Sequence, residues 1–128
     1  MNKRGLLIVA AVLAVFLVGG AVVIYKSMVV GGRSRTINIT ITGDRAAVSG
    51  DAVKIDGTEI TVNKGDRVTL NITADRKEEI HVHLHDTPFE IDAPGGTVTR
   101  TISADQDGTY EYEIEDSRIH LGNLIVNP

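Results

Sequence analysis

The chain of 128 residues contains no cysteine. This absence excludes a disulfide framework, a metal site built on thiolate ligands, and a lipid attached through an N-terminal cysteine. Because a chain without cysteine fits a reducing or an oxidising compartment equally well, the absence says nothing about location. The sequence also lacks the G-x-S-x-G and H-E-x-x-H motifs of common hydrolases. We therefore expect a protein that is not an enzyme.

Positive charge is scarce in the larger part of the chain. Residues 31–128 contain ten lysines and arginines against seventeen aspartates and glutamates, a net charge of −7, whereas the whole chain carries −4. Nucleic-acid binding requires a clustered basic surface, so we expect no nucleic-acid partner. A negative net charge is instead compatible with the attraction of cations.

A single uncharged apolar run is long enough to cross a membrane. It covers residues 6–25, and at about 1.5 Å per residue a helix of this length spans roughly 30 Å. We expect a transmembrane anchor that binds the lipid bilayer, with Lys3 and Arg4 placing the tail 1–5 in the cytoplasm. The rest of the chain then faces the periplasm or the cell surface. The alternative is a cleaved signal peptide, whose apolar core is normally shorter, about 7 to 15 residues, and precedes a small-residue cleavage motif.

The remaining sequence divides into a tether and a domain. Residues 26–35 include Gly31-Gly32 and show no apolar periodicity, which is typical of a flexible linker. In residues 36–128 apolar and polar residues alternate, most clearly at 37–42 and 68–73, and glycine and aspartate mark turns between the alternating segments. Strands at this spacing with no helical segment between them predict an all-β domain, an antiparallel sandwich or a small barrel.

The apolar side of the chain changes near the middle of this domain. Apolar residues occupy even positions from Ile80 to Leu84 but odd positions at Phe89 and Ile91. A bend or bulge at residues 86–88 explains the change, and bulges often lie beside functional sites.

All four histidines lie in two places. His81, His83 and His85 belong to the segment E-I-H-V-H-L-H-D, and His120 precedes the last apolar segment. In a strand, alternate side chains point to the same side about 6.6 Å apart, so the first three are expected to line one face. Neighbouring pairs are then within reach of one metal ion, and imidazole suits copper and zinc. Alternatively, these histidines form only the solvated face of an outer strand.

Acidic residues follow the same alternation in the predicted closing hairpin, residues 109–115 and 121–126. Tyr110, Tyr112 and Ile114 share one face. The acidic residues of the other face and the turn are Glu111, Glu113, Glu115 and Asp116. They form either a solvated strand face or a surface that attracts cations or docks a partner.

Three segments carry a family resemblance. T-E-I-T-V-N-K-G-D-R-V-T-L-N-I-T-A-D (58–75) resembles the strand, K-G-D turn and strand that open cupredoxin domains. E-E-I-H-V-H-L-H-D (78–86) is similar to the segment with their first histidine ligand, and residues 108–127 are similar to their closing ligand hairpin. Over residues 52–127 the chain resembles small secreted or membrane-anchored bacterial cupredoxin-like proteins with an H-V-H segment and no cysteine. The resemblance implies a Greek-key β-sandwich.

The resemblance also implies which ligands are present. His81 matches the first histidine ligand of cupredoxins, and His83 is its substitute if the register is shifted by two residues. Ile114 stands at the thiolate cysteine and His120 at the axial methionine, while no histidine occupies residues 115–119. Conventional blue copper electron transfer is therefore excluded, because its soft ligand is missing.

The expected function follows from the ligands that remain. We expect the final hairpin to fold against the histidine strand, so that His81 and His120 meet at one end of the domain. Further ligands of this weak site are sought among His83, His85, Asp86, Glu115 and Asp116. Such a site suits Cu(II), and Zn(II) less well. The alternative is a metal-free sandwich that serves as a structural or interaction module for an envelope protein.

Overall fold

The computed structural model describes residues 32–128. The predicted tail 1–5, the membrane anchor 6–25 and the linker up to residue 31 lie outside the described residues. Within 32–128, no helix combines the length and the apolar character that crossing a membrane demands.

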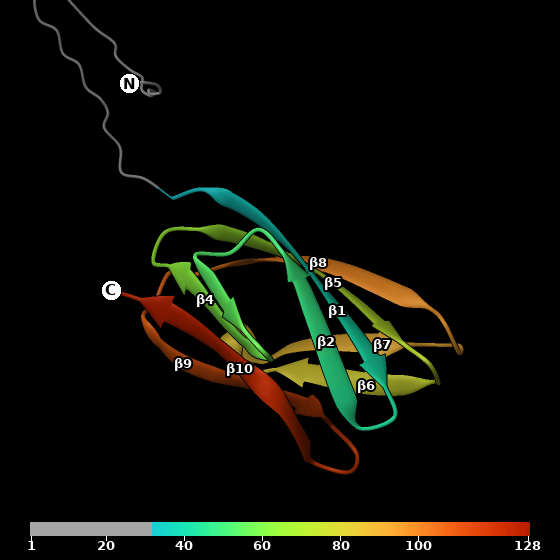
Figure 1. Cartoon of the computed structure of the whole chain (residues 1–128). Coiled ribbons are helices and arrows are strands. Elements are labelled where there is room, and N and C mark those ends of the chain that lie inside the picture. The colour runs from blue at the N-terminus through green and yellow to red at the C-terminus, as the bar shows by residue number, and fades with distance from the viewer. Residues whose placement is uncertain (1–31) are drawn as a thin grey trace, which may run out of the picture. The chain divides into compact units, whose positions relative to one another are not determined.

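The described residues form two facing β-sheets (Figure 1). The strands are β1 (Ser34–Thr42), β2 (Arg45–Gly50), β3 (Lys54–Asp56), β4 (Glu59–Asn63), β5 (Arg67–Ala74), β6 (Glu78–Val82), β7 (Thr87–Ile91), β8 (Thr97–Ser103), β9 (Gly108–Ile114) and β10 (Ile119–Asn127). The smaller sheet has the order β2-β1-β5-β8 and the larger sheet the order β3-β4-β10-β9-β6-β7. The predicted all-β sandwich is confirmed.

The prediction of a purely antiparallel sandwich is wrong, because both sheets are mixed. β1 pairs with β5 in parallel, and β10 pairs with β4 in parallel. The chain leaves the smaller sheet after β2, passes through β3 and β4 in the larger sheet, and returns as β5 beside β1. Parallel neighbours require such a long connection, and alternation within each strand contains no signal for it.

The core lies between the sheets and follows the alternation of the strands. In β1, Ile37, Ile39 and Ile41 are buried while the residues between them are exposed. Phe89 of β7 and Tyr112 of β9 are the largest fully buried side chains. Burying one large apolar side chain, such as isoleucine or phenylalanine, contributes about 1.5–3 kcal/mol, so one residue of register shift in a strand would be strongly destabilising.

The predicted bend exists, but it begins earlier than residues 86–88. β6 ends at Val82, and a short 3-10 helix, η3 (Leu84–Asp86), leads into β7. His85 and Asp86 have φ values of 58° and 46°, in the left-handed region that non-glycine residues rarely adopt. His85 therefore does not continue the face of β6, and the prediction that three histidines line one strand face is wrong.

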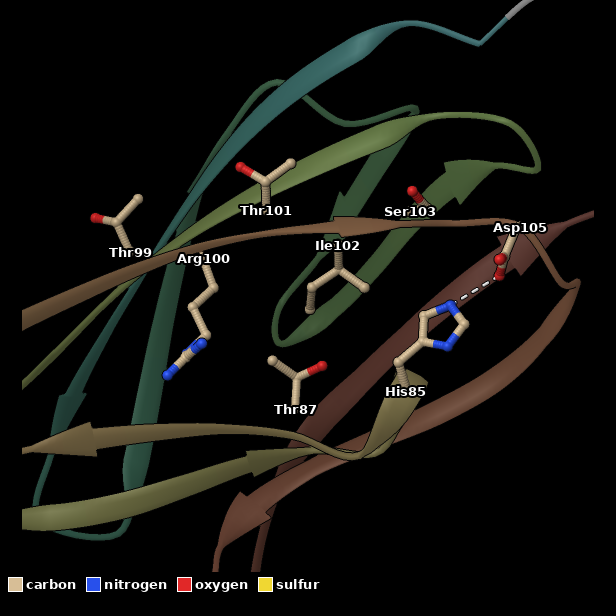
Figure 2. Close-up of a pocket in the computed structure, with 8 residues that line it drawn as sticks. All are labelled: His85, Thr87, Thr99, Arg100, Thr101, Ile102, Ser103 and Asp105. Atoms are coloured by element: carbon tan, nitrogen blue, oxygen red, sulfur yellow. Dashed lines mark hydrogen bonds and ion pairs between the residues drawn. The ribbon is translucent and has the colours of Figure 1, made fainter.

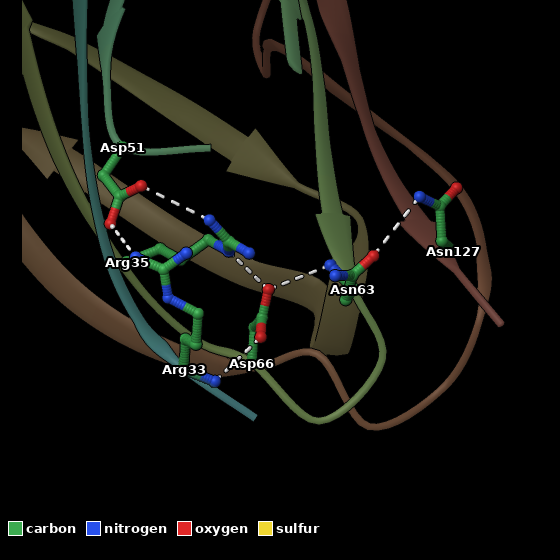
Figure 3. Close-up of polar contacts among 6 residues, drawn as sticks. All are labelled: Arg33, Arg35, Asp51, Asn63, Asp66 and Asn127. Atoms are coloured by element: carbon green, nitrogen blue, oxygen red, sulfur yellow. Dashed lines mark hydrogen bonds and ion pairs between the residues drawn. The ribbon is translucent and has the colours of Figure 1, made fainter. Parts of the chain in front are cut away.

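A buried ion pair holds the start of β1. The guanidinium of Arg35 donates from Nε to Asp66 Oδ2 at 2.5 Å (Figure 3). Both side chains are almost completely buried. Asp66 also accepts backbone N–H bonds from Arg33 and Asn63. Burial alone would raise the pKa of Asp66, but these hydrogen bonds and the Arg35 charge together lower it. β1 therefore includes Ser34 and Arg35, which the sequence pattern assigned to the linker.

Candidate metal site

The candidate site lies on the outer face of the larger sheet, where β10, β9 and β6 are neighbours. Glu113 in the central strand β9 is paired in register with His81 of β6 and with His120 of β10. The adjacent pair Ile80 and Ile114 is buried. Since successive side chains alternate between the faces of a sheet, His81, Glu113 and His120 point away from the core.

Three alternate glutamates, two in β9 and one directly after this strand, each contact one imidazole. We call Glu111, Glu113 and Glu115 the β9 glutamate row. His81 Nδ1 lies 2.8 Å from Glu115 Oε1, and His83 Nε2 lies 2.8 Å from Glu113 Oε2. On the other side of β9, His120 Nδ1 lies 2.6 Å from Glu111 Oε2. The row is thus a line of carboxylates flanked by imidazoles on both sides.

Three of these side chains form a group that could hold a metal ion. One donor atom from each of His81, His83 and Glu113 lies within 4.8 Å of the other two. The two imidazoles are stacked, with ring centroids 4.9 Å apart and planes inclined by 24°. Ligands bound at about 2.0–2.2 Å lie at most about 4.4 Å from each other. Because stacked rings direct their nitrogen lone pairs side by side, the two imidazoles must rotate toward a common point to coordinate one ion. We call His81, His83 and Glu113 the two-histidine cluster.

Protonation of the cluster is linked to its geometry. The hydrogen bond to Glu113 raises the pKa of His83 above 6.5, and the Glu113 charge reinforces it against the opposing effect of burial. A metal ion binds neutral imidazole. An ion at the cluster must therefore displace the proton that His83 and Glu113 share, and a proton on His83 competes with metal over a wider pH range than on an isolated histidine.

Of the other predicted ligands, His120 and His85 lie apart from the cluster, whereas Asp86 and Glu115 lie beside His81. His120 shares the sheet face with His81, but it lies across β9, about two strand spacings or roughly 10 Å away, and it is outside the group of donor atoms. His85 pairs with Asp105 at 2.8 Å, on the loop after β8. Asp86 Oδ1 lies 3.7 Å from His81 Nε2 and is largely exposed. The histidine strand and the final hairpin are adjacent as expected, yet His81 and His120 do not meet.

The position that the resemblance assigns to the thiolate faces the core. Ile114 is 1% exposed and is paired across the strands with Ile80 and Ile119. His81 projects from the opposite side of the same sheet. Hydrocarbon thus fills the place of the soft ligand, and the ligands that remain do not fit a type 1 copper centre.

Glu113 is the cluster residue that the sequence did not single out. The alternation E-Y-E-I-E placed it on an acidic strand face without distinguishing it from Glu111 and Glu115. Its role depends on the pairing of β9 with β6, in which Glu113 stands opposite His81 and accepts from His83. The H-V-H segment and the alternating glutamates predict the contact of Glu113 with the histidines only if β6 and β9 are already known to be neighbours.

The chain was compared with known proteins. No protein-family model and no curated protein sequence matches it. Among solved structures, it is similar to the L499M mutant of the laccase from B. aclada (TM-score 0.54, 21% identity, 76% of this chain and 23% of the laccase). It is also similar to a chain of a heme-copper terminal oxidase dimer (TM-score 0.54, 20% identity, 76% of this chain and 66% of that chain). A third similar structure is auracyanin from the photosynthetic bacterium Roseiflexus castenholzii (TM-score 0.50, 17% identity, 71% of this chain and 97% of auracyanin). A multicopper oxidase, mgLAC, is matched over 39% of its length, so the chain spans less than half of it and of the laccase.

Proposed function

We propose that this chain, which has the cupredoxin-like fold of auracyanin and of the laccase domain that it matches, binds Cu(II) on its surface without type 1 electron transfer. The observation that carries the proposal is the two-histidine cluster, whose three donor atoms lie within 4.8 Å of one another. Two of the similar solved structures are named as copper proteins, a multicopper oxidase and a heme-copper terminal oxidase, which supports the choice of metal. The proposed site lies on the outer face of the larger sheet and not between the two sheets.

The donor set favours Cu(II) over other metals. Two imidazoles and a carboxylate are ligands for Cu(II) and Zn(II), whereas Cu(I) prefers thiolate and thioether. The chain has no cysteine, and its two methionines, Met1 and Met28, precede the domain. For a given set of nitrogen and oxygen ligands Cu(II) binds more tightly than Zn(II). A bound Cu(II) would act as a Lewis acid or as cargo, and the residues of the chain would hold it by three ligands, with water completing the shell.

We further propose that the domain works outside the cytoplasm, tethered to the membrane. The uncharged run at residues 6–25 and the basic residues Lys3 and Arg4 support this placement. We propose no enzymatic activity. In this setting the protein receives copper from, or passes it to, another envelope protein, and the weak ligand set suits exchange better than storage.

A metal-free interaction module is the second candidate, and one observation favours it. Within residues 32–128, each histidine already has a carboxylate partner at 2.8 Å or less. Imidazole N–H groups can donate to the carboxylates in these pairs and satisfy the β9 glutamate row without any ion. Surface pairs of this kind contribute about 0–1 kcal/mol each, so they fit a solvated sheet face.

Calorimetric titration of Cu(II) into the full-length chain in detergent micelles separates the two candidates. The copper proposal expects saturable binding of one equivalent and an electron paramagnetic resonance spectrum with nitrogen splitting. His83→Ala removes a ligand and should weaken binding at least tenfold, and Glu113→Gln should weaken it less. His85→Ala is the matched control, since His85 lies outside the cluster, and it should bind as the unchanged chain does. Negligible binding by every form supports the metal-free module.

A further inference from the structure

β8 is an edge strand whose outward main-chain groups are unpaired in the described structure. It pairs with β5 on one side and has no strand on the other. Beyond its ends, Ala104 donates to Asp66 and accepts from Gly65, while the Gly96 carbonyl accepts from Ala74. Because antiparallel residues bond to one side alternately, the even-numbered residues of β8 bond to β5. The N–H and C=O groups of the odd-numbered residues, Thr97, Thr99, Thr101 and Ser103, therefore face outward.

The two edges of the larger sheet are better protected than β8. β7 contains Pro88, which has no N–H to offer, and Glu90. β3 is only three residues long and begins with Lys54. Proline, charge and shortness are the devices by which proteins prevent strand addition at an edge. β8 has seven residues in uninterrupted register with β5, contains no proline, and carries a single charge, that of Arg100.

A pocket of about 500 Å³ runs along this edge, between β8 and the start of β7. Figure 2 shows Arg100 and Ile102 pointing from β8 into this gap, opposite Thr87. The hydrogen bond between His85 Nε2 and Asp105 Oδ1 closes one end. The left-handed turn at His85, which removes this residue from the metal cluster, thus supplies one wall of the pocket.

The positive charge of Arg100 determines which kind of strand can pair with β8. Arg100 is exposed, and it has no ion pair with any residue in 32–128. It is also the central residue of β8, so an antiparallel pairing of two β8 strands centred on their midpoints would place two Arg100 side chains opposite each other. Like charges directly opposite are destabilising, which disfavours this pairing with a second copy of the chain. A carboxylate at the same position would be stabilised.

We propose that the free edge of β8 binds an extended segment of a partner protein by strand addition, with an aspartate or glutamate opposite Arg100. Main-chain hydrogen bonds to the odd-numbered residues of β8 supply affinity, and the side chains that enter the pocket supply specificity. On the incoming segment, apolar residues two positions before and after the acid lie beside Val98 and Ile102, which share the inner face of β8. This interaction involves none of the residues of the two-histidine cluster.

The probe is the synthetic peptide acetyl-TVTETVT-amide, titrated to millimolar concentration into the isotope-labelled full-length chain. The amide resonances of the odd-numbered β8 residues should shift and become protected from hydrogen exchange. Replacing the central glutamate of the peptide by lysine should weaken binding roughly two- to fivefold. The variant Arg100→Glu should reverse this preference, an outcome that a merely structural role of Arg100 does not produce.

A matched pair of variants tests the main-chain bonds. Thr101→Pro removes an N–H that faces the free edge and should abolish peptide binding, whereas Thr101→Val retains that N–H and should preserve it. Circular dichroism and the dispersion of the remaining resonances check that both variants are folded. Absence of peptide binding by the unchanged chain overturns the proposal, as does equal binding by the proline and valine variants or concentration-dependent self-association through β8.

Discussion

Replacing Asp66 by asparagine tests the contact that holds the first strand of the domain. Asp66 Oδ2 accepts hydrogen bonds from Arg35 Nε and the backbone N–H of Asn63, and Oδ1 accepts from the N–H of Arg33. The side chains of Asp66 and Arg35 are only 2% and 4% exposed. Asparagine keeps the shape but removes the charge, so the guanidinium of Arg35 loses its buried counter-charge and keeps only the partly exposed Asp51 as an ionic partner.

The expected loss of stability is large. Removing one partner of a buried ion pair costs about 3–5 kcal/mol, against a total unfolding free energy of about 5–15 kcal/mol for a domain. Asp51→Asn is the matched control. Asp51 also pairs with Arg35, at 3.3 Å, but its side chain is 48% exposed, so this change should cost no more than about 1 kcal/mol.

Urea unfolding monitored by circular dichroism measures both variants, and its pH dependence gives a second test. Because the pKa of Asp66 is lowered in the folded state, the stability that this residue contributes is complete above the unfolded carboxyl pKa of about 3.9. It is lost as the pH falls through the lower folded value. Asp66→Asn should therefore flatten the acid side of the stability curve. A loss below about 1 kcal/mol, equal to that of the control, would refute this description of the buried pair.

Three further predictions concern the larger sheet. The pKa of His83, measured by NMR titration, should lie above 6.5 and fall in Glu113→Gln. The stability that the His83–Glu113 pair contributes is then present at low pH and lost as the pH rises through the folded pKa of His83. The affinity for Cu(II) should increase over the same pH range. A His83 pKa unchanged by Glu113→Gln contradicts this coupling. Tyr112→Phe should lower the unfolding free energy by about 1 kcal/mol, because the 2.7 Å hydrogen bond to the Thr58 carbonyl is lost; no change in urea unfolding contradicts it. Gly122→Ala should be more destabilising, roughly 1–3 kcal/mol, since a Cβ there would lie 2.3 Å from the same carbonyl oxygen; an unchanged midpoint contradicts it.

Local alternation predicted the strands well and their neighbours poorly. Ile37, Ile39 and Ile41 are buried as their period indicates. The parallel pairing of β1 with β5 depends on a connection that passes through the other sheet. No local sequence pattern predicts such a connection. The burial of Arg35 was missed for the same reason, because its partner Asp66 lies 31 residues further along the chain.

The candidate site shows the same division. The parity of β6 correctly placed His81 on the face opposite Ile80. The strand was expected to continue through His85, but it ends at Val82, since φ is positive at His85 and Asp86 without a glycine to signal it. The resemblance placed the final hairpin beside the histidine strand, as observed. It indicated His120 as a ligand rather than Glu113, which stands between His81 and His120 in the sheet.

The most direct test of the proposed function is to locate bound Cu(II) on the full-length chain by paramagnetic broadening in NMR spectra. At substoichiometric Cu(II), the proposal predicts that the resonances of His81, His83 and Glu113 broaden first, while those of β3, at the opposite end of the same sheet, remain sharp. An unaffected spectrum, or broadening centred on His120 and Glu111 instead, would contradict the assignment of a copper site to the two-histidine cluster.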